Sequence, residues 1–181
     1  KRTPYSCRPY AADEYPKELG PSHYLQEDGY IFVYQDVRGR WMSEGEYTNM
    51  TPHVPNKKSP KQIDESSDTY DTIDWLLKHV KNHNVNVGQW GLSYPGFYTT
   101  AGAIEAHPAL KASSPQAPIA DFYFDDFHHR GAYILAYFAV TEVFGRQTEP
   151  TTESWYTLMD PGTRDAYRFY LDMGSLANGD Q

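Results

Sequence analysis

A single serine stands between a strand-like segment and a helix-like segment, and this order constrains the fold more than any other feature. Residues 85–90, Val-Asn-Val-Gly-Gln-Trp, have the composition of a short strand. Residues 97–106 are rich in small residues and typical of a helix. Gly91-Leu92-Ser93-Tyr94-Pro95-Gly96 joins the two segments. A serine on such a sharp turn has its hydroxyl lifted out of the sheet, beside the free N–H groups of the new helix.

This arrangement is the nucleophile elbow of an α/β-hydrolase, in which the usual pattern is G-x-S-x-G. The second glycine comes one residue late here, at Gly96. A serine between glycines also occurs in ordinary turns, so the motif alone does not decide. The strand before it and the helix after it favour a catalytic role for Ser93.

The segments upstream of the elbow predict an alternating α/β order with a parallel sheet. Residues 29–36 form a continuous apolar run, which predicts a central strand covered on both faces. Residues 38–61 form a long polar loop of the kind that is functional or covers a site. A helix follows, because Tyr70, Ile73, Leu77 and Val80 share one face, with Ser66, Ser67 or Asp68 able to cap its start.

The character of the chain changes after about residue 120. Residues 107–115 predict a linker and a short strand that completes the first region, 1–120. Residues 121–181 then predict a helical region with no further strand. Its helical stretches are 122–144, 154–159 and 163–173, with a turn at Asp160-Pro161-Gly162.

Composition excludes several function classes. The formal net charge of −8 argues against nucleic acid or an anionic membrane as a partner. No apolar run approaches the roughly 18 residues of a membrane helix. No His, Cys or carboxylate spacing suggests a metal site, and no phosphate-binding or dinucleotide glycine pattern occurs, so no cofactor is expected. The lone Cys7 has no elbow around it and is interpreted as structural.

Several motifs in this order resemble one family of serine hydrolases. They are Arg2-Thr3-Pro4-Tyr5, residues 29–39 with Ser43-Glu44-Gly45, Asp71-Thr72-Ile73-Asp74-Trp75-Leu76, the elbow at 91–96 and His107-Pro108-Ala109-Leu110-Lys111. The chain resembles the α-amino acid ester hydrolases, which belong with cocaine esterase, the glutaryl cephalosporin acylases and the X-prolyl dipeptidyl peptidases. The resemblance is specific over about the first 130 residues. It implies an α/β-hydrolase domain, a helical cap and a carboxyl-terminal jelly-roll domain.

The resemblance also implies roles for individual residues. Ser93 would be the nucleophile, and the backbone N–H of Tyr94 would be one donor to the oxyanion. The phenol of Tyr5 would be the second donor. Without the resemblance, Tyr5 would be interpreted as a packed, hydrogen-bonded aromatic residue.

Asp125 and Asp126 bear on the substrate. In the α-amino acid ester hydrolases, an aspartate at this place joins carboxylates that pair with the α-ammonium group of the substrate. Asp126 aligns with it, but the preceding segment is one residue short, so Asp125 stays open. The alternative is a solvated acidic start of a helix.

The rest of a catalytic triad is not expected among nearby residues. His128 and His129 invite a local triad, but the chain order in this fold is nucleophile, acid and then histidine. The family places both of the latter beyond residue 181, so His128 and His129 are interpreted as cap or cleft-wall residues. This chain alone therefore lacks the expected acid and histidine, and the rest of the core and the jelly roll lie outside it.

The sequence thus predicts a serine hydrolase that cleaves esters or amides of α-amino acids through a Ser93 acyl-enzyme, with acyl transfer to β-lactam nuclei as an extension. The expected partner is a small substrate with an α-amino group, and a homo-oligomer stays open. One alternative is an X-prolyl dipeptidyl peptidase or a general carboxylesterase, and another is a non-catalytic binding module with a hydrolase-like fold. Family analogy suggests a bacterial secreted or periplasmic protein.

Overall fold

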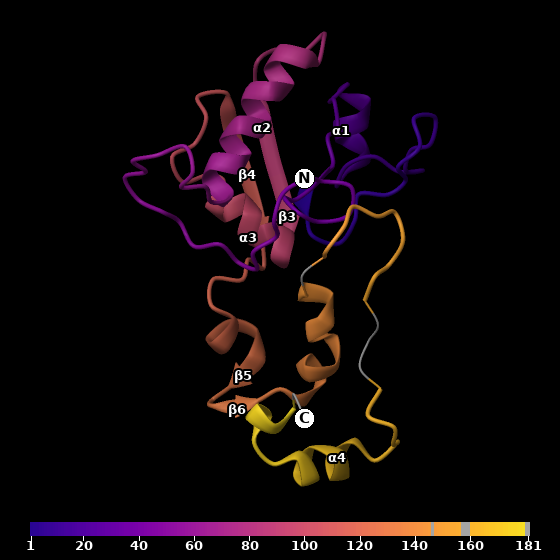
Figure 1. Ribbon diagram of the computed structural model, residues 1–181. Helices are drawn as coiled ribbons and strands as arrows, with labels where there is room; N and C mark the ends of the chain where they lie inside the picture. Colours follow the sequence, from indigo (N-terminus) through magenta and orange to yellow (C-terminus); the bar gives the residue numbers. More distant parts are fainter. Residues whose placement is uncertain (146, 157–159, 180–181) are drawn as a thin grey trace. The chain divides into compact units, whose positions relative to one another are not determined.

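The computed structural model describes residues 1–145, 147–156 and 160–179 (Figure 1). The chain divides into two compact units. The first comprises residues 1–120 together with 146–153, and the second comprises 121–145 and 154–181. Each unit is built from its own short elements.

A parallel strand–helix–strand segment forms the centre of the first unit. Strand β3 (Val87–Leu92) pairs in parallel with β4 (Leu110–Gln116), and helix α3 (Tyr94–Ala101) connects them. Figure 1 shows α3 lying along both strands, and α3 contacts each of them. The predicted order of strand, elbow, helix and strand is confirmed, although α3 begins three residues earlier than the composition of 97–106 indicates, because the turn itself winds into the helix.

Helix α2 (Glu65–His79) packs against α3 and confirms the long helix that the sequence predicts. Its N-cap is Asp64, not one of the serines or the aspartate that follow. The Asp64 carboxylate accepts the Ser67 N–H at 2.9 Å, while the Ser67 hydroxyl accepts the Asp64 N–H at 2.9 Å. This reciprocal capping box satisfies two backbone donors, and the helix therefore starts upstream of the predicted capping residues.

Strands β1 (Arg2–Thr3) and β2 (Gln35–Asp36) form a second parallel pair. The expectation of a buried strand over 29–36 is wrong for most of its length. Tyr30 and Ile31 are 59% and 50% exposed, and only the end of the run is paired. Strand pairing depends on a neighbour, and Arg2–Thr3 reaches only the last residues of the run. A short helix, α1 (His23–Glu27), also lies in the segment that the sequence indicates as loop.

The second unit contains short helical segments and one small hairpin. The hairpin corrects the expectation that no strand returns after residue 120, because β5 (His128–His129) pairs antiparallel with β6 (Ala132–Tyr133) across Arg130 and Gly131. Both turn residues have positive φ, as a two-residue hairpin turn requires. The helices are η1 (Tyr123–Phe127), η2 (Leu135–Phe144), α4 (Ala166–Met173) and η3 (Leu176–Asn178).

Other expectations for this region have mixed outcomes. Residues 154–156 are not helical, and residues 157–159 of that predicted stretch lie outside the described residues. The turn at Asp160-Pro161-Gly162 is confirmed, because the Gly162 N–H donates to the Asp160 side chain at 2.8 Å. Helix α4 falls within the predicted stretch 163–173.

The capping carboxylate of α2 gives a testable stability prediction. Asp64 is 3% exposed and also accepts the Val54 N–H and the Lys57 ammonium, each at 2.8 Å. Burial alone would raise the pKa of this carboxyl, but the Lys57 hydrogen bond and the backbone N–H groups outweigh burial and hold the pKa well below its usual range. We expect Asp64→Ala to lower the free energy of unfolding by at least about 1 kcal/mol, the value of a lost cap.

Asp64→Asn is the matched variant, because asparagine caps a helix but cannot ionise. A carboxyl whose pKa is lowered by folding stabilises the protein above its unfolded pKa of about 3.9 and loses that contribution as the pH falls below it. The difference in urea unfolding between wild type and Asp64→Asn should therefore shrink between pH 6 and pH 3. A constant or growing difference would contradict this assignment.

Candidate functional site

Ser93 occupies the turn between β3 and α3 in a conformation that few residues adopt. Its φ is +62° and its ψ is −122°. Such a conformation costs on the order of 1–3 kcal/mol and persists only where the surroundings hold it. Here the Ser93 N–H donates to the Gln116 carbonyl at 2.9 Å, and its own carbonyl accepts the Phe97 N–H at 3.0 Å. The side chain is exposed and makes no hydrogen bond with the described residues, so the backbone is fixed and the hydroxyl is available.

The glycines of the elbow have a steric cause. A Cβ on Gly91 would lie 2.1 Å from the Pro95 carbonyl oxygen, which no side chain could tolerate. A Cβ on Gly96 would lie 2.6 Å from the Gln116 carbonyl oxygen and 3.2 Å from the Cα of Pro118. The late glycine is thus explained, because position 96, and not 95, faces the end of the neighbouring strand β4.

Tyr94 anchors the elbow from the inside. Its ring is fully buried, and its hydroxyl accepts the Met50 N–H at 2.7 Å, contacts the Tyr47 hydroxyl at 2.9 Å and donates to the Asn49 side chain. Burial, followed by the neighbouring Tyr47, raises the pKa of Tyr94 far above its usual value, so the phenol stays neutral. The backbone N–H of Tyr94 lies in the first turn of α3, where N–H groups have no partner within the helix.

The long loop 38–61 reaches the elbow through these contacts. Tyr47, Asn49 and Met50 all belong to it, and all three meet the Tyr94 hydroxyl. The sequence indicates a loop that is functional or covers a site, and its contact with the elbow agrees with that expectation. Sequence reasoning missed the individual residues, because no motif marks Tyr47 or Asn49.

Tyr5 lies next to the elbow. It follows β1, and its ring meets the Tyr94 ring edge to face, with centroids 6.2 Å apart and an angle of 82°. The Tyr5 side chain is 40% exposed, whereas Pro4 before it is fully buried. Tyr5 therefore lies against Tyr94, the residue that directly follows Ser93 in the elbow.

Cys7 is unsuited to nucleophilic chemistry. Burial, and then the Asp36 carboxylate, raise its pKa to about 11, so the thiol stays protonated near neutral pH. The same carboxylate accepts the Cys7 N–H at 2.9 Å and the Tyr10 hydroxyl at 2.7 Å. Asp36 therefore fixes the segment that follows Tyr5, and the structural interpretation of Cys7 fits these contacts.

The two adjacent aspartates of the second unit are in different environments. Asp125 is exposed, and its carboxylate accepts the Asp121 N–H at 3.0 Å. Asp126 is half-buried and faces the Tyr137 hydroxyl. Burial is the main reason why the pKa of Tyr137 is raised, and the charge of Asp126 and its hydrogen bond raise this pKa further. Asp125 thus closes a local turn, while Asp126 is directed toward a phenol.

The two histidines of β5 also lie in the second unit. The His128 ring stacks on Tyr123 with centroids 4.0 Å apart and meets Tyr133 edge to face. Its Nδ1 atom is buried and has no hydrogen-bond partner among the described residues. His129 pairs with Ala132 in the hairpin and is exposed.

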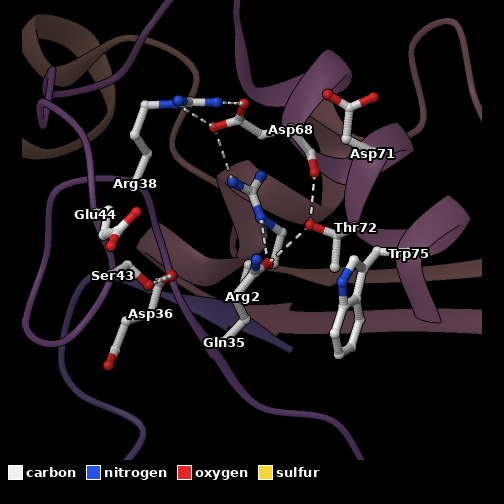
Figure 2. Close-up of a pocket in the computed structure, with 10 residues that line it drawn as sticks. All are labelled: Arg2, Gln35, Asp36, Arg38, Ser43, Glu44, Asp68, Asp71, Thr72 and Trp75. Carbon is white, nitrogen blue, oxygen red and sulfur yellow. Dashed lines mark hydrogen bonds and ion pairs between the residues drawn. The ribbon is translucent and has the colours of Figure 1, made fainter. Parts of the chain in front are cut away.

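A polar hollow of about 350 Å³ lies beside β2 and α2 (Figure 2). Figure 2 shows the Asp68 carboxylate between the guanidinium groups of Arg2 and Arg38. Arg2 also donates to Glu65 at 3.0 Å and to Gln35 at 3.2 Å. These groups bind one another, and none of the residues that the sequence predicts for the site lines this hollow.

Two kinds of feature are absent from the described residues. No group of three or more histidine, cysteine, aspartate or glutamate residues there could hold a metal ion. No helix among them has the length and apolar character to span a membrane.

The parallel strands and the serine at the strand-to-helix turn are those of the α/β-hydrolase fold. Comparison with known sequences makes this specific. The chain belongs to the X-Pro dipeptidyl-peptidase (S15) family, whose profile matches residues 1–166.

Three known proteins are similar to this chain. Cocaine esterase from Rhodococcus sp. (strain MB1 Bresler) is 38% identical over 96 residues, which are 53% of this chain and 14% of that protein. The structure of a selenomethionine-labelled α-amino acid ester hydrolase matches 98% of this chain with a TM-score of 0.76 and 32% identity. An aminopeptidase from a marine sediment archaeon, Thaumarchaeota archaeon, matches 86% with a TM-score of 0.69 and 35% identity. The chain spans 29% and 25% of those two structures.

The steric analysis of the elbow gives a second prediction. In the intact protein, Gly91→Ala should lower the free energy of unfolding by about 1–3 kcal/mol, the usual cost of overpacking. It should also slow labelling of Ser93 by a fluorophosphonate, because the turn must shift. Gly88→Ala on the same strand is the control, since its Cβ would meet only the Ala112 carbonyl oxygen at 3.9 Å. Equal effects of the two substitutions would refute the steric account.

Proposed function

We propose that this protein is a serine hydrolase that cleaves esters or amides of α-amino acids. Ser93 attacks the acyl carbon as its hydroxyl proton passes to a general base. The N–H of Tyr94 and the phenol of Tyr5 donate to the resulting oxyanion. The leaving alcohol or amine then takes up the proton, and water or an amine releases the acyl group from Ser93. The α-amino acid ester hydrolase and the aminopeptidase among the relatives support this substrate class.

One observation carries the proposal. Ser93 is held in a strained backbone conformation while its side chain stays exposed. The Tyr5 ring packs on Tyr94, the residue that follows Ser93. Strain of this kind at an exposed polar residue is typical of active sites.

Asp126 is the proposed partner of the substrate ammonium. A half-buried carboxylate attracts a cation more strongly than a solvated one, because less water screens the charge. Asp125 is less suited, since its side chain is exposed to solvent. The proposal therefore assigns recognition to the second aspartate of the pair.

A second candidate is an X-prolyl dipeptidyl peptidase, which the family profile favours. Such an enzyme would use the same serine and the same oxyanion donors and would also bind an amino group. A general carboxylesterase, as the relationship to cocaine esterase suggests, would not need an ammonium partner. Transfer of acyl groups to β-lactam nuclei is a further extension of the first reaction. A binding module without activity would leave Ser93 unreactive.

The oxyanion donor and the nucleophile can be tested together. Tyr5→Phe removes one hydroxyl and should lower kcat about 10²- to 10³-fold, the usual loss for one oxyanion donor. Ser93→Ala should abolish both hydrolysis of an amino acid p-nitrophenyl ester and labelling by a fluorophosphonate. Tyr24→Phe is the control, because Tyr24 is 67% exposed and lies on α1. Labelling that survives Ser93→Ala would exclude Ser93 as the nucleophile.

The ammonium partner is tested with two substrates. We expect Asp126→Asn to lower kcat/KM for an α-amino ester about 10-fold or more, since a hydrogen bond to a charged group is worth about 1.5–3 kcal/mol. The des-amino analogue should be hydrolysed as before. Asp125→Asn serves as the adjacent control and should affect both substrates little. If Asp126→Asn weakens both substrates equally, the ammonium assignment fails and the carboxylesterase alternative gains.

A further inference from the structure

The peptide group that leads into Tyr5 is held by two buried side chains. The Pro4 carbonyl accepts the indole N–H of Trp41 at 3.0 Å and the Nε–H of Arg40 at 3.2 Å. Arg40 is fully buried, and Trp41 is 3% exposed. Both residues follow β2, and neither has a role in the function proposed above.

Trp41 is itself held firmly in place. The Gln147 side-chain amide accepts the Trp41 N–H and donates to the Trp41 carbonyl at 2.7 Å. The Thr151 N–H donates to the same carbonyl at 2.9 Å. The Arg8 guanidinium lies 4.8 Å from the centre of the indole ring. These hydrogen bonds fix the Trp41 backbone, and the buried indole, with the Arg8 guanidinium over its ring, donates its N–H to the Pro4 carbonyl.

Arg40 also connects the Pro4 carbonyl to the elbow. Its guanidinium lies 4.4 Å from the centre of the Tyr47 ring, and the Tyr47 hydroxyl contacts the Tyr94 hydroxyl. Pro4 and Tyr94 are therefore joined through two buried side chains. The segments that carry both proposed oxyanion donors share one rigid support.

We propose that Trp41 is a positioning residue of the oxyanion hole, which fixes the Tyr5 phenol through the Pro4 carbonyl and is assisted by Arg40. This inference rests on the proposed function. An oxyanion donor must lie within about 2.7–3.1 Å of the developing charge. Burial alone does not fix the Tyr5 side chain, which is 40% exposed, so the path of its backbone must be set by the residues that bind it. Supporting shells of this kind decide whether a site is held closely enough to act.

The test uses Trp41→Phe in the intact protein, because phenylalanine keeps an aromatic ring and removes the indole N–H. We expect kcat for an amino acid p-nitrophenyl ester to fall by about 10-fold or more, as small displacements of catalytic groups do, with KM changed less than about twofold. Trp75→Phe is the matched control, since the Trp75 side chain is 56% exposed on α2. A rise in KM with unchanged kcat would overturn the inference.

A double-mutant cycle separates positioning from general damage. If Trp41 acts through Tyr5, then Trp41→Phe should have little further effect on kcat in a Tyr5→Phe background. An equal fold-loss in both backgrounds would overturn the inference and leave the proposed function intact. Tyr5→Phe with unchanged kcat would overturn the oxyanion assignment and the inference together.

A second replacement guards against loss of folding. Benzothienylalanine at position 41 substitutes sulfur for the indole N–H at nearly constant volume. A thermal melt like that of wild type with kcat lowered as in Trp41→Phe supports the positioning role. A wild-type melt with wild-type kcat contradicts it.

Discussion

The backbone of Ser93 is held at a φ of +62° by one hydrogen bond to strand β4 and one to its own helix. That conformation costs about 1–3 kcal/mol, and two typical hydrogen bonds together contribute about 2 kcal/mol, so the bonds offset a strain of this size. The buried ring of Tyr94 and its hydroxyl contacts hold the turn further. Most other features of the first unit can be understood as meeting this one requirement.

The close approach of chain segments follows from the same requirement. The elbow can turn only where Gly91 admits the Pro95 carbonyl and Gly96 admits the end of β4. The loop 38–61 then covers the inner side through Tyr47 and Asn49. Tyr5 reaches the outer side from β1, and its neighbour Pro4 is bound by Arg40 and Trp41. The proposed nucleophile Ser93 and the proposed donors Tyr5 and Tyr94 are therefore held by contacts with buried groups.

The sequence predicts the parts of this arrangement that depend on local chemistry. The elbow and helix α2 are encoded by neighbouring residues, so glycine placement and apolar spacing were sufficient to locate them. The strand expected at 29–36 failed, because pairing depends on a distant partner that reaches only its end. The hydrogen bonds that hold the Trp41 backbone could not be predicted from the sequence, since their partner Gln147 lies 106 positions away. Asp125 and Asp126 are the same residue type in sequence, and only the structure distinguishes them, by their exposure and by the groups they contact.

The proposed function divides its roles between the two units, and this division has an evolutionary consequence. Ser93, Tyr94 and Tyr5 all belong to the first unit, whereas Asp126 belongs to the second. Under the proposed function, substitutions in the second unit can therefore change which substrates bind without disturbing the residues proposed to break the bond. A family with this division can change its substrates and keep one reaction, and this agrees with the similarity of the chain to an esterase, an ester hydrolase and an aminopeptidase.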